Sequence, residues 1–401
     1  MTARRFNLLH LAALLAIILL NLAAYANSFR AEWQFDDYPN IVENYSLHID
    51  NFSELKNAHN REQQGINRIV CFYTFALDHL FHGLDVAGWH LTNVLIHISA
   101  GMLVYMIMGL TLTLSVFRPL SRKAVFLISL ATALLWSLSP VQTQAVTYIV
   151  QRLASLGGML YLLSLFLYIK GRRCQQGGRS RVGLLLLILA LLPFGLALLT
   201  KEHTLTLPAF IFLYEFFFIR GAGRIPLKPL LGLAAALILV SGIMFAVNRA
   251  AFDFLTNGYE GREFTLVERL LTEMRILVRY LSLMAWPHPG RLNLDYNLHI
   301  STGLFSPVTT FLSMLFLLSI TGLGFWLARR DPFVSFGIFW YLGNNVIESS
   351  ILPLELMFEH RMYLPSVWVY AVAIVLLFRL IEPGAGRINA DLRHSAIQRM
   401  Q

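Results

Sequence analysis

Apolar residues gather along this chain in runs long enough to cross a membrane, and shorter polar segments separate the runs. About 20 mainly apolar residues in a helix span a hydrocarbon layer roughly 30 Å thick. The pattern therefore predicts an all-α polytopic membrane protein with about ten transmembrane helices. We place these spans at residues 6–27, 90–112, 123–139, 153–169, 182–199, 204–219, 229–247, 304–328, 332–346 and 364–381.

Arginine and lysine residues assign the two sides of the membrane. More than half of the 32 basic residues fall in segments on one side, together with few acids. Cytoplasmic loops carry such an excess, so we expect a multi-pass plasma (inner) membrane protein with both termini in the cytoplasm. Residues 28–89 and 248–303 then form large extracytoplasmic loops. The net charge of +9 follows from this topology and does not indicate a nucleic-acid partner.

Residues 264–286 are apolar, yet charged side chains recur among them at helical spacing. A charge at the centre of a span costs at least about 2.5 kcal/mol. We therefore expect an amphipathic helix in the outer membrane interface rather than another span. Residues 1–383 form one transmembrane domain in this interpretation, and residues 384–401 form a short cytoplasmic tail.

Composition agrees with a membrane protein, because 56% of the residues are hydrophobic and 14% are charged, against about 25% charged in soluble domains. A basic start, an apolar run and an Ala-x-Ala sequence at residues 24–26 resemble a cleavable signal peptide. The run is long for that purpose, and we favour a retained first span. Cys71 and Cys174 fall on opposite sides of the membrane, so no disulfide within the chain is expected.

Two adjacent carboxylates, Asp36 and Asp37, follow the first span on its extracytoplasmic side. Like charges this close disfavour simultaneous ionisation, so one carboxyl should hold its proton more tightly. Such a pair at the outer mouth of a membrane enzyme suits a general base or a site for a divalent cation. A solvated loop is the other interpretation, and the two residues alone do not decide among the three.

Further polar residues gather on the same side of the membrane. His90, Asn93 and His97 share one helical face by their spacing, which favours the wall of a substrate cavity over a hydrogen-bonded core. A tight turn carries Lys201 and Glu202, which either face a substrate or form a simple surface ion pair. The remaining candidates are Gln142, Tyr148, Arg152, Glu359, His360 and Arg361.

Several segments, taken in order, resemble the GT-C superfamily of polytopic glycosyltransferases. In particular, they resemble the transmembrane O-mannosyltransferases that carry tetratricopeptide repeats, and their bacterial relatives. Each segment is short, and the order and spacing of the set, over nearly all of residues 30–368, make the resemblance fairly specific. The segments are FDDYPNIVEN (35–44), HGLDVAGWHLTNVLIH (82–97), SPVQTQAVTYIVQR (139–152), LLTKEHTLTLP (198–208), RYLSLMAWP (279–287), LNLDY (292–296), ILPLE (351–355) and EHRMYLPS (359–366).

The resemblance implies a catalytic acid in the first outer loop, which matches Asp36 and Asp37, with Asp37 slightly favoured as the base. It also implies a polyprenyl-phosphate-linked sugar donor at the outer interface and inversion at the sugar carbon. The acceptor would be a hydroxyl of a secreted protein such as a pilin, or of an envelope glycolipid. Because arginine grips phosphate with two hydrogen bonds, the candidates for the lipid phosphate are Arg279 and Arg361, with Lys201 or Arg152 as alternatives.

Two features depart from the family pattern. Relatives often show HPVHTEAV where this chain has SPVQTQAV at 139–146, which weakens a metal or acid role for this loop. The repeats are absent from the sequence, so we expect no built-in arm for recognising a protein acceptor. A lipid-linked sugar flippase or transporter is the alternative function. Transporters often place charges near the membrane midplane and show repeated halves, and neither feature is evident here.

Overall fold

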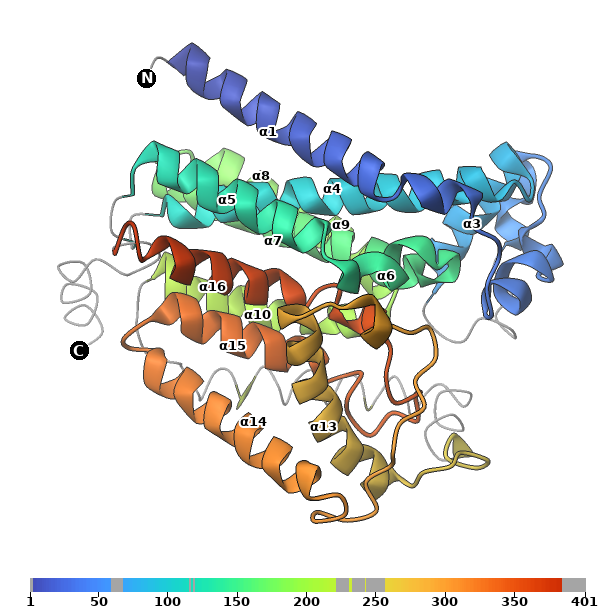
Figure 1. Ribbon diagram of the computed structural model, residues 1–401. Helices are drawn as coiled ribbons and strands as arrows, with labels where there is room; N and C mark the ends of the chain where they lie inside the picture. The colour runs from blue at the N-terminus through green and yellow to red at the C-terminus, as the bar shows by residue number, and fades with distance from the viewer. Residues whose placement is uncertain are drawn as a thin grey trace. The chain divides into compact units, whose positions relative to one another are not determined.

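The computed structural model describes residues 3–58, 68–114, 117, 120–220, 231–232, 242 and 257–383. Over these residues the chain is helical without a β-strand, which confirms the predicted all-α polytopic class. They divide into two compact units (Figure 1). The first comprises 3–58, 68–114, 120–204 and 373–383, and the second comprises 117, 205–220, 231–232, 242 and 257–372.

Long apolar helices build the first unit (Figure 1). The helix α4 (Val86–Leu112) packs against α5 (Arg122–Ser137) and α7 (Arg152–Gln176). In turn, α7 packs against α8 (Ser180–Leu189) and α9 (Leu191–Leu198). The other helices that lie wholly in this unit are α1 (Ala3–Ala24), α3 (Ile69–His82) and α6 (Thr143–Thr147).

The connections of the first unit are short turns of helix rather than open loops. Asn51, for example, starts one of them by accepting a hydrogen bond from the Ser53 N–H at 3.1 Å, as N-capping residues do. These turns leave Asp36 and Asp37 immediately before one helical segment. The turns are η1 (Ala26–Arg30), η2 (Tyr38–Val42), η3 (Tyr45–Leu47), η4 (Phe52–Asn57), η5 (Pro140–Gln142), η6 (Ile149–Gln151) and the start of η7 (Glu202–Thr206).

An aromatic core holds the second unit together. Phe210 and Trp340 have ring centroids 4.9 Å apart, and Phe336 and Trp368 have centroids 4.7 Å apart. Such tilted and edge-on contacts add to the burial of these large side chains. The helices and turns of this unit are α10 (Leu207–Tyr214), η8 (Glu215–Ile219), α13 (Leu266–Ala285), η9 (Pro289–Arg291), α14 (Val308–Leu327), α15 (Pro332–Asn345), η10 (Glu359–Met362) and α16 (Ser366–Phe378), the last of which ends in the first unit.

Five helical stretches in the described residues are long and apolar enough to cross a membrane, and a sixth is added if one pair bent by 50° counts as a single span. The predicted count of ten is therefore not confirmed. The helix α15, for example, has 14 residues, about 21 Å at 1.5 Å per residue, which is shorter than the hydrocarbon layer. The predicted span at 229–247 and the tail at 384–401 lie outside the described residues, apart from 231–232 and 242.

The amphipathic segment forms the helix α13, and it is not among the membrane-capable helices of the described residues. Thr265 and Glu268 start α13 with a capping box, in which each side chain binds the backbone N–H of the other. The placement of α13 in the membrane interface stays a prediction, as does the sidedness of the loops.

Candidate active site

Asp36 and Asp37 lie on a sharp turn in the first unit. Phe35 directly before them has a φ of 34°, a left-handed conformation that costs an L-residue roughly 1–2 kcal/mol. The turn is closed by a backbone hydrogen bond of 2.7 Å from the Asp37 N–H to the Gln34 carbonyl. The two neighbouring carboxylates consequently differ in environment, because Asp36 is exposed while Asp37 is 1% exposed.

Both carboxylate oxygens of Asp37 accept hydrogen bonds from backbone N–H groups. Oδ2 accepts from Gln34 at 3.0 Å, and Oδ1 accepts from Val150 at 2.7 Å. Burial raises the pKa of Asp37 to about 6, against the opposing effect of these two N–H groups. Because Val150 lies 113 residues along the chain, Asp37 ties the turn to the segment that leads into α7.

Tyr148 supports the same turn from the other side. Its hydroxyl oxygen accepts a hydrogen bond of 2.8 Å from the Asp36 N–H. Burial raises the pKa of this hydroxyl, against the opposing effect of the Asp36 N–H, so the Tyr148 hydroxyl stays neutral. Of the predicted site residues in the first unit, the structure thus brings together Asp36, Asp37 and Tyr148.

Arg152 is fully buried and has acceptors for all five of its N–H groups. Nε donates to Asn93 Oδ1 at 2.6 Å, and Nη1 donates to the carbonyl and hydroxyl of Thr74 at 3.3 and 3.2 Å. Nη2 donates to Asp78 Oδ2 at 2.5 Å and to the Trp89 carbonyl at 3.2 Å. No donor remains for a lipid phosphate, so the structure does not support Arg152 as the alternative phosphate ligand.

Asn93 and His97 form part of the same interior. The Asn93 amide donates to two backbone carbonyls that precede α7, at 3.1 and 3.3 Å, and His97 Nε2 bonds to the Ser137 carbonyl at 2.8 Å. This arrangement fits a hydrogen-bonded core. The spacing of these residues in the sequence had instead favoured the wall of a substrate cavity. The other predicted cavity residues on this side, His90 and Gln142, are likewise fully buried.

The turn that contains Lys201 and Glu202 separates its two charges. Lys201 is 6% exposed, whereas the Glu202 side chain is 46% exposed and lies 4.0 Å from Arg68 Nε. Exposed ion pairs of this kind contribute about 0–1 kcal/mol. Glu202 therefore forms a surface pair with Arg68 rather than the pair with Lys201 that was the alternative at the sequence level.

The second unit holds the remaining predicted site residues. The Arg279 guanidinium lies over the ring of Tyr296, 5.0 Å from its centroid. The Tyr296 hydroxyl donates to Glu359 Oε1, which also accepts a hydrogen bond of 2.8 Å from the Asn293 N–H. Burial raises the pKa of Glu359. His360, the next residue, is 5% exposed and stacks on the neighbouring Phe358 ring.

Arg361 belongs to a buried set of three charges with Arg269 and Glu273. Glu273 Oε1 lies 3.0 Å from Arg269 Nη2 and 3.9 Å from Arg361 Nη1. Burial raises the pKa of Glu273 to about 7, against the effect of the two arginines. Arg361 also donates to the carbonyls of Leu356 and Glu355, at 3.0 and 2.6 Å, while its Nε has no acceptor within the described residues. Arg361 is therefore held firmly and keeps donor capacity.

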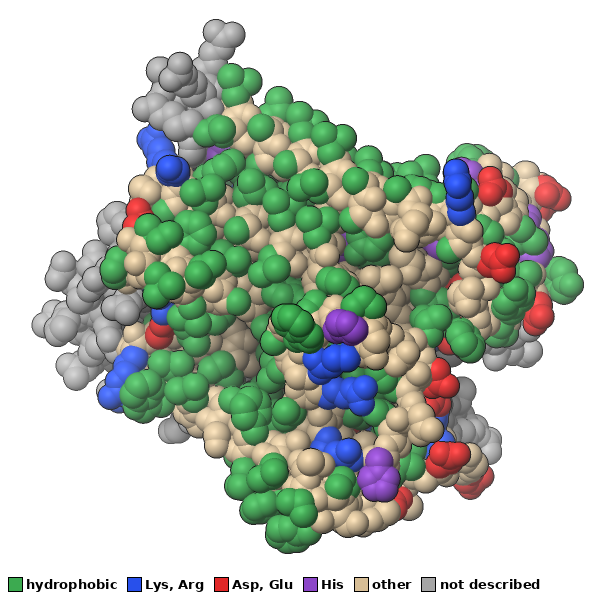
Figure 2. Space-filling view, viewed as in Figure 1, with side chains coloured by type: hydrophobic (Ala, Val, Ile, Leu, Met, Phe, Trp, Pro, Cys, Tyr) green, Lys and Arg blue, Asp and Glu red, His purple; other side chains and the backbone are tan. Residues whose placement is uncertain are grey.

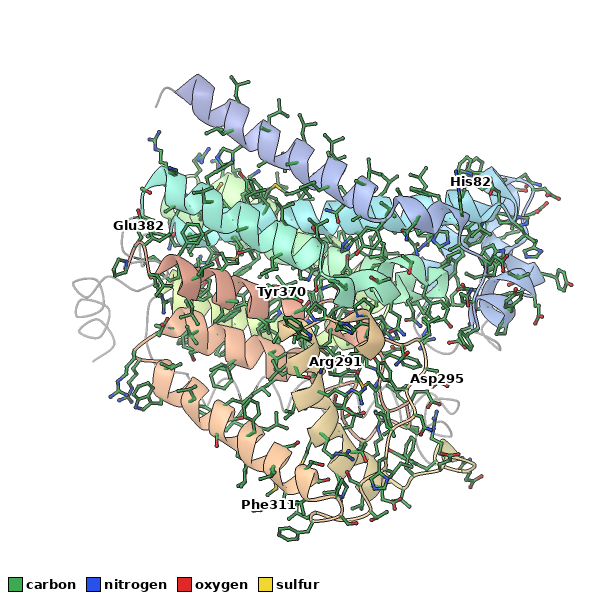
Figure 3. The ribbon with its side chains drawn as sticks, viewed as in Figure 1. His82, Arg291, Asp295, Phe311, Tyr370 and Glu382 are labelled. Atoms are coloured by element: carbon green, nitrogen blue, oxygen red, sulfur yellow. The ribbon has the colours of Figure 1, made fainter. Side chains whose placement is uncertain are left out.

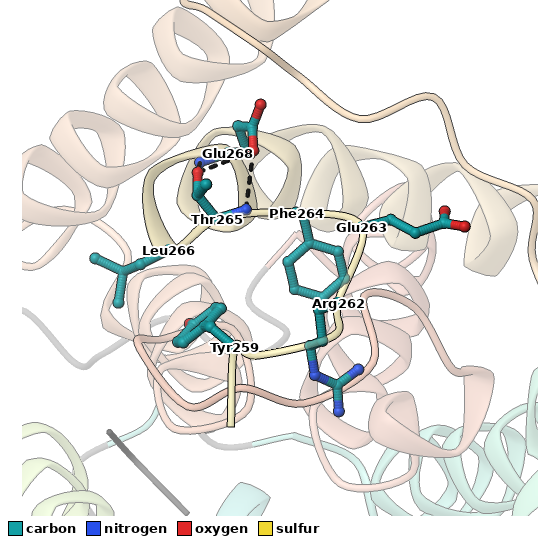
Figure 4. Close-up of a pocket in the computed structure, with 7 residues that line it drawn as sticks. All are labelled: Tyr259, Arg262, Glu263, Phe264, Thr265, Leu266 and Glu268. Carbon is teal, nitrogen blue, oxygen red and sulfur yellow. Dashed lines mark hydrogen bonds between the residues drawn. The ribbon is translucent and has the colours of Figure 1, made fainter. Parts of the chain in front are cut away.

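A cavity of about 310 Å³ opens beside the N-terminal end of α13 (Figure 4). Tyr259 and Phe264 face it, and the capping bonds between Thr265 and Glu268 form part of its wall. No predicted site residue is among those that line it.

Metal ligands are not grouped in the part of the chain that the structure describes. No set of three or more His, Cys, Asp or Glu side chains there lies close enough together to hold a metal ion.

Three residues that organise these sites, namely Asp78, Glu273 and Tyr296, are not among the site residues predicted from the sequence. Asp78 and Glu273 are buried acids that neutralise arginines, and Tyr296 links Arg279 to Glu359. The signal was available for Glu273, because Arg269 precedes it by four residues, the spacing of a helical ion pair. Tyr296 lies inside LNLDY, a segment already noted for its resemblance.

Comparison with known proteins gives relatives of one kind. Protein O-mannosyl-transferase tmtc2 of Xenopus laevis is 30% identical over 210 residues, which are 49% of this chain and 23% of that protein. This chain is similar over about half of its length to proteins named protein O-mannosyl-transferases. Protein O-mannosyl-transferase TMTC3 of Mus musculus is 25% identical over 251 residues, 56% of this chain and 25% of the relative. Protein O-mannosyl-transferase TMTC1 of Homo sapiens is 28% identical over 206 residues, which are 48% of this chain and 22% of that protein.

The relatives confirm the resemblance to the transmembrane O-mannosyltransferases. The chain spans about a quarter of the length of these curated relatives. No family model matches the chain, and no solved structure matches it.

Proposed function

We propose that this protein is a membrane glycosyltransferase that moves a sugar from a polyprenyl-phosphate donor to a hydroxyl of a protein acceptor on the extracytoplasmic face. The observation that carries the proposal is the Asp36–Asp37 turn, in which one carboxylate is exposed and the other is buried and anchored. The names of the relatives favour a sugar transfer to protein, and the apolar helices favour a lipid-linked donor.

Asp36 is the general base in this proposal, which reverses the slight preference for Asp37. A base must reach the proton it removes, and Asp36 is exposed. Asp37 already uses both oxygens to accept backbone hydrogen bonds. Its role is to position the turn, together with Tyr148.

The reaction follows from these roles. The Asp36 carboxylate takes the proton of the acceptor hydroxyl as its oxygen attacks the anomeric carbon of the sugar. The bond between that carbon and the phosphate oxygen breaks, and polyprenyl phosphate leaves with the electron pair. Attack from the face opposite the phosphate inverts the configuration at this carbon.

Arg279 and Arg361 are the proposed ligands of the donor phosphate, and both belong to the second unit. Fixed cationic donors aimed at the charge that develops on a leaving group stabilise the transition state. Within the described residues, Arg279 makes no side-chain hydrogen bond, and the buried Nε of Arg361 has no acceptor. Replacing either arginine with lysine keeps the positive charge but loses the planar fork of N–H donors that binds phosphate with two hydrogen bonds. Activity should therefore be highest for wild type, lower for the lysine variant and lowest for the alanine variant.

The deciding experiment supplies purified protein in detergent with a panel of sugar-charged polyprenyl phosphates and an acceptor peptide. Release of polyprenyl phosphate together with a glycosylated peptide is the expected result. In proteoliposomes, a donor that crosses the bilayer unconsumed would overturn the proposal and establish the flippase alternative instead. Arg279→Ala and Arg361→Ala should each lower transition-state stabilisation by roughly 3–4 kcal/mol.

A further inference from the structure

Residues 291–299, a short segment of the second unit, run beside α13 and are held there by arginines. Arg275 Nη1 donates to the His299 carbonyl at 2.6 Å, and Arg291 donates to the Ser282 carbonyl and hydroxyl at 3.2 and 2.6 Å. Figure 3 labels Arg291 and Asp295, which mark this segment, and Figure 2 shows basic side chains gathered on the same face. The segment is therefore fixed at both ends against the helix.

Arg279 is held differently from its two neighbours. Its guanidinium lies over the π-face of Tyr296, and the described residues offer it no side-chain hydrogen bond. A cation over an aromatic face is attracted without using its N–H donors. The contact consequently restricts where the Arg279 head group lies while its donors stay available.

Tyr296 is itself fixed through its hydroxyl. The hydroxyl has two acceptors in reach, Glu359 Oε1 and the Arg291 carbonyl at 3.0 Å, and the Asn293 N–H donates to the same Glu359 oxygen at 2.8 Å. Glu359 is 3% exposed and stands at the start of η10, the turn that also carries Arg361. One buried carboxylate is thus connected to both arginines, to Arg361 along the backbone and to Arg279 through the ring of Tyr296.

We propose that Tyr296 and Glu359 are positioning residues that hold the Arg279 guanidinium ready for a polyprenyl phosphate. The inference rests on the proposed function, because it takes Arg279 as a phosphate ligand. A long arginine side chain otherwise loses rotamer freedom on binding, and pre-organisation removes part of that cost. The support therefore acts on donor affinity more than on the chemical step.

The test measures binding of polyprenyl phosphate to the purified full-length protein in detergent, and donor KM and kcat in the transfer assay. Tyr296→Phe keeps the ring and loses its anchor, so affinity should fall by about 3- to 10-fold, with kcat within about two-fold. Tyr296→Leu also loses the π-face and should bind more weakly than Tyr296→Phe. Glu359→Gln keeps an acceptor for the hydroxyl and should bind more tightly than Glu359→Ala.

Tyr259→Phe is the matched control. Its hydroxyl also donates to a backbone carbonyl, that of Ile351 at 2.8 Å, and it lies in the same unit. This variant should bind polyprenyl phosphate as wild type does. Melting temperatures of all variants show which changes come from misfolding.

A double-mutant cycle separates positioning from general stability. In the Arg279→Ala background, Tyr296→Phe should have no further effect on affinity, because the group that it positions is gone. Additive losses, or a Tyr296→Phe protein that binds polyprenyl phosphate as tightly as wild type, would overturn the inference while leaving the transferase intact. Failure of the proposed function looks different, since wild-type protein would then transfer no sugar from any polyprenyl-phosphate donor to the acceptor.

Discussion

Arg152 and Asp78 form an ion pair in the interior of the first unit, with Nη2 and Oδ2 2.5 Å apart and side chains that are 0% and 8% exposed. The pair joins α7 to α3, and Thr92 of α4 donates to the second oxygen of Asp78 at 2.7 Å. Three helices therefore depend on one pair of opposite charges.

Asp78→Asn is expected to destabilise the protein by about 3–5 kcal/mol, because it leaves the buried Arg152 charge without compensation. Thermal unfolding in detergent measures the loss. Glu202→Gln is the control, since it breaks a pair whose side chains are 37% and 46% exposed and should cost no more than about 1 kcal/mol. Equal melting temperatures for the two variants would show that the pair contributes little.

The two acids of the turn should respond differently to amide substitution. Asp36→Asn removes the proposed base from an exposed position, so turnover should fall by about 10²–10⁴ while the melting temperature stays near that of wild type. Asp37→Asn turns one acceptor oxygen into a donor beside a backbone N–H, so it should lower stability as well as turnover. A stable, fully active Asp36→Asn protein would exclude Asp36 as the base.

The pH dependence of stability tests the surroundings of Asp37. Its pKa is about 6 in the folded chain, above the ordinary 3.8 that applies when unfolded. A raised folded pKa gives a contribution that is complete below about pH 4 and is lost as the pH rises through 6, by about 3 kcal/mol. The stability gap between wild type and Asp37→Asn should therefore shrink from pH 5 to pH 8. A gap that stays level from pH 5 to pH 8 would mean that the N–H groups of Gln34 and Val150 outweigh burial and hold the folded pKa at or below its ordinary value.

The sequence indicated which segments hold the candidate site residues, because acids and arginines are conspicuous between apolar runs. It did not indicate which of the two acids is buried, since Val150, 113 residues away, decides that for Asp37. Arg152 could be named as an alternative phosphate ligand for the same reason, because its partner Asp78 lies 74 residues earlier in the chain. Patterns along one chain report local periodicity, whereas the role of a buried charge depends on partners that only the fold supplies.

Sidedness can be tested by cysteine labelling in intact cells. Cys71 and Cys174 are both buried and free, so a background that lacks them removes little surface reactivity. A membrane-impermeant maleimide should then label Glu43→Cys and Pro289→Cys from outside, because basic residues flank the opposite side. Gln176→Cys, at the end of α7, should react only after the cells are permeabilised. Labelling of Gln176→Cys in intact cells would reverse the proposed orientation.

The contact between α7 and α8 is close enough that one methyl group should disturb it. A Cβ added at Gly183 would lie 2.7 Å from the carbonyl oxygen of Gly171 and 2.5 Å from Cγ of Gln175. The side chain can turn away, but the carbonyl belongs to a helix backbone and cannot move without shifting α7. Gly183→Ala is therefore expected to destabilise the protein by about 1–3 kcal/mol, the range for overpacked interiors. The loss is measured as a lower melting temperature in detergent.

Gly195→Ala in α9 is the matched control, because nothing lies within 4 Å of its added Cβ. Alanine there should be neutral or stabilise the helix by up to about 1 kcal/mol. If the two alanine variants melt together, the helices do not approach through their glycines.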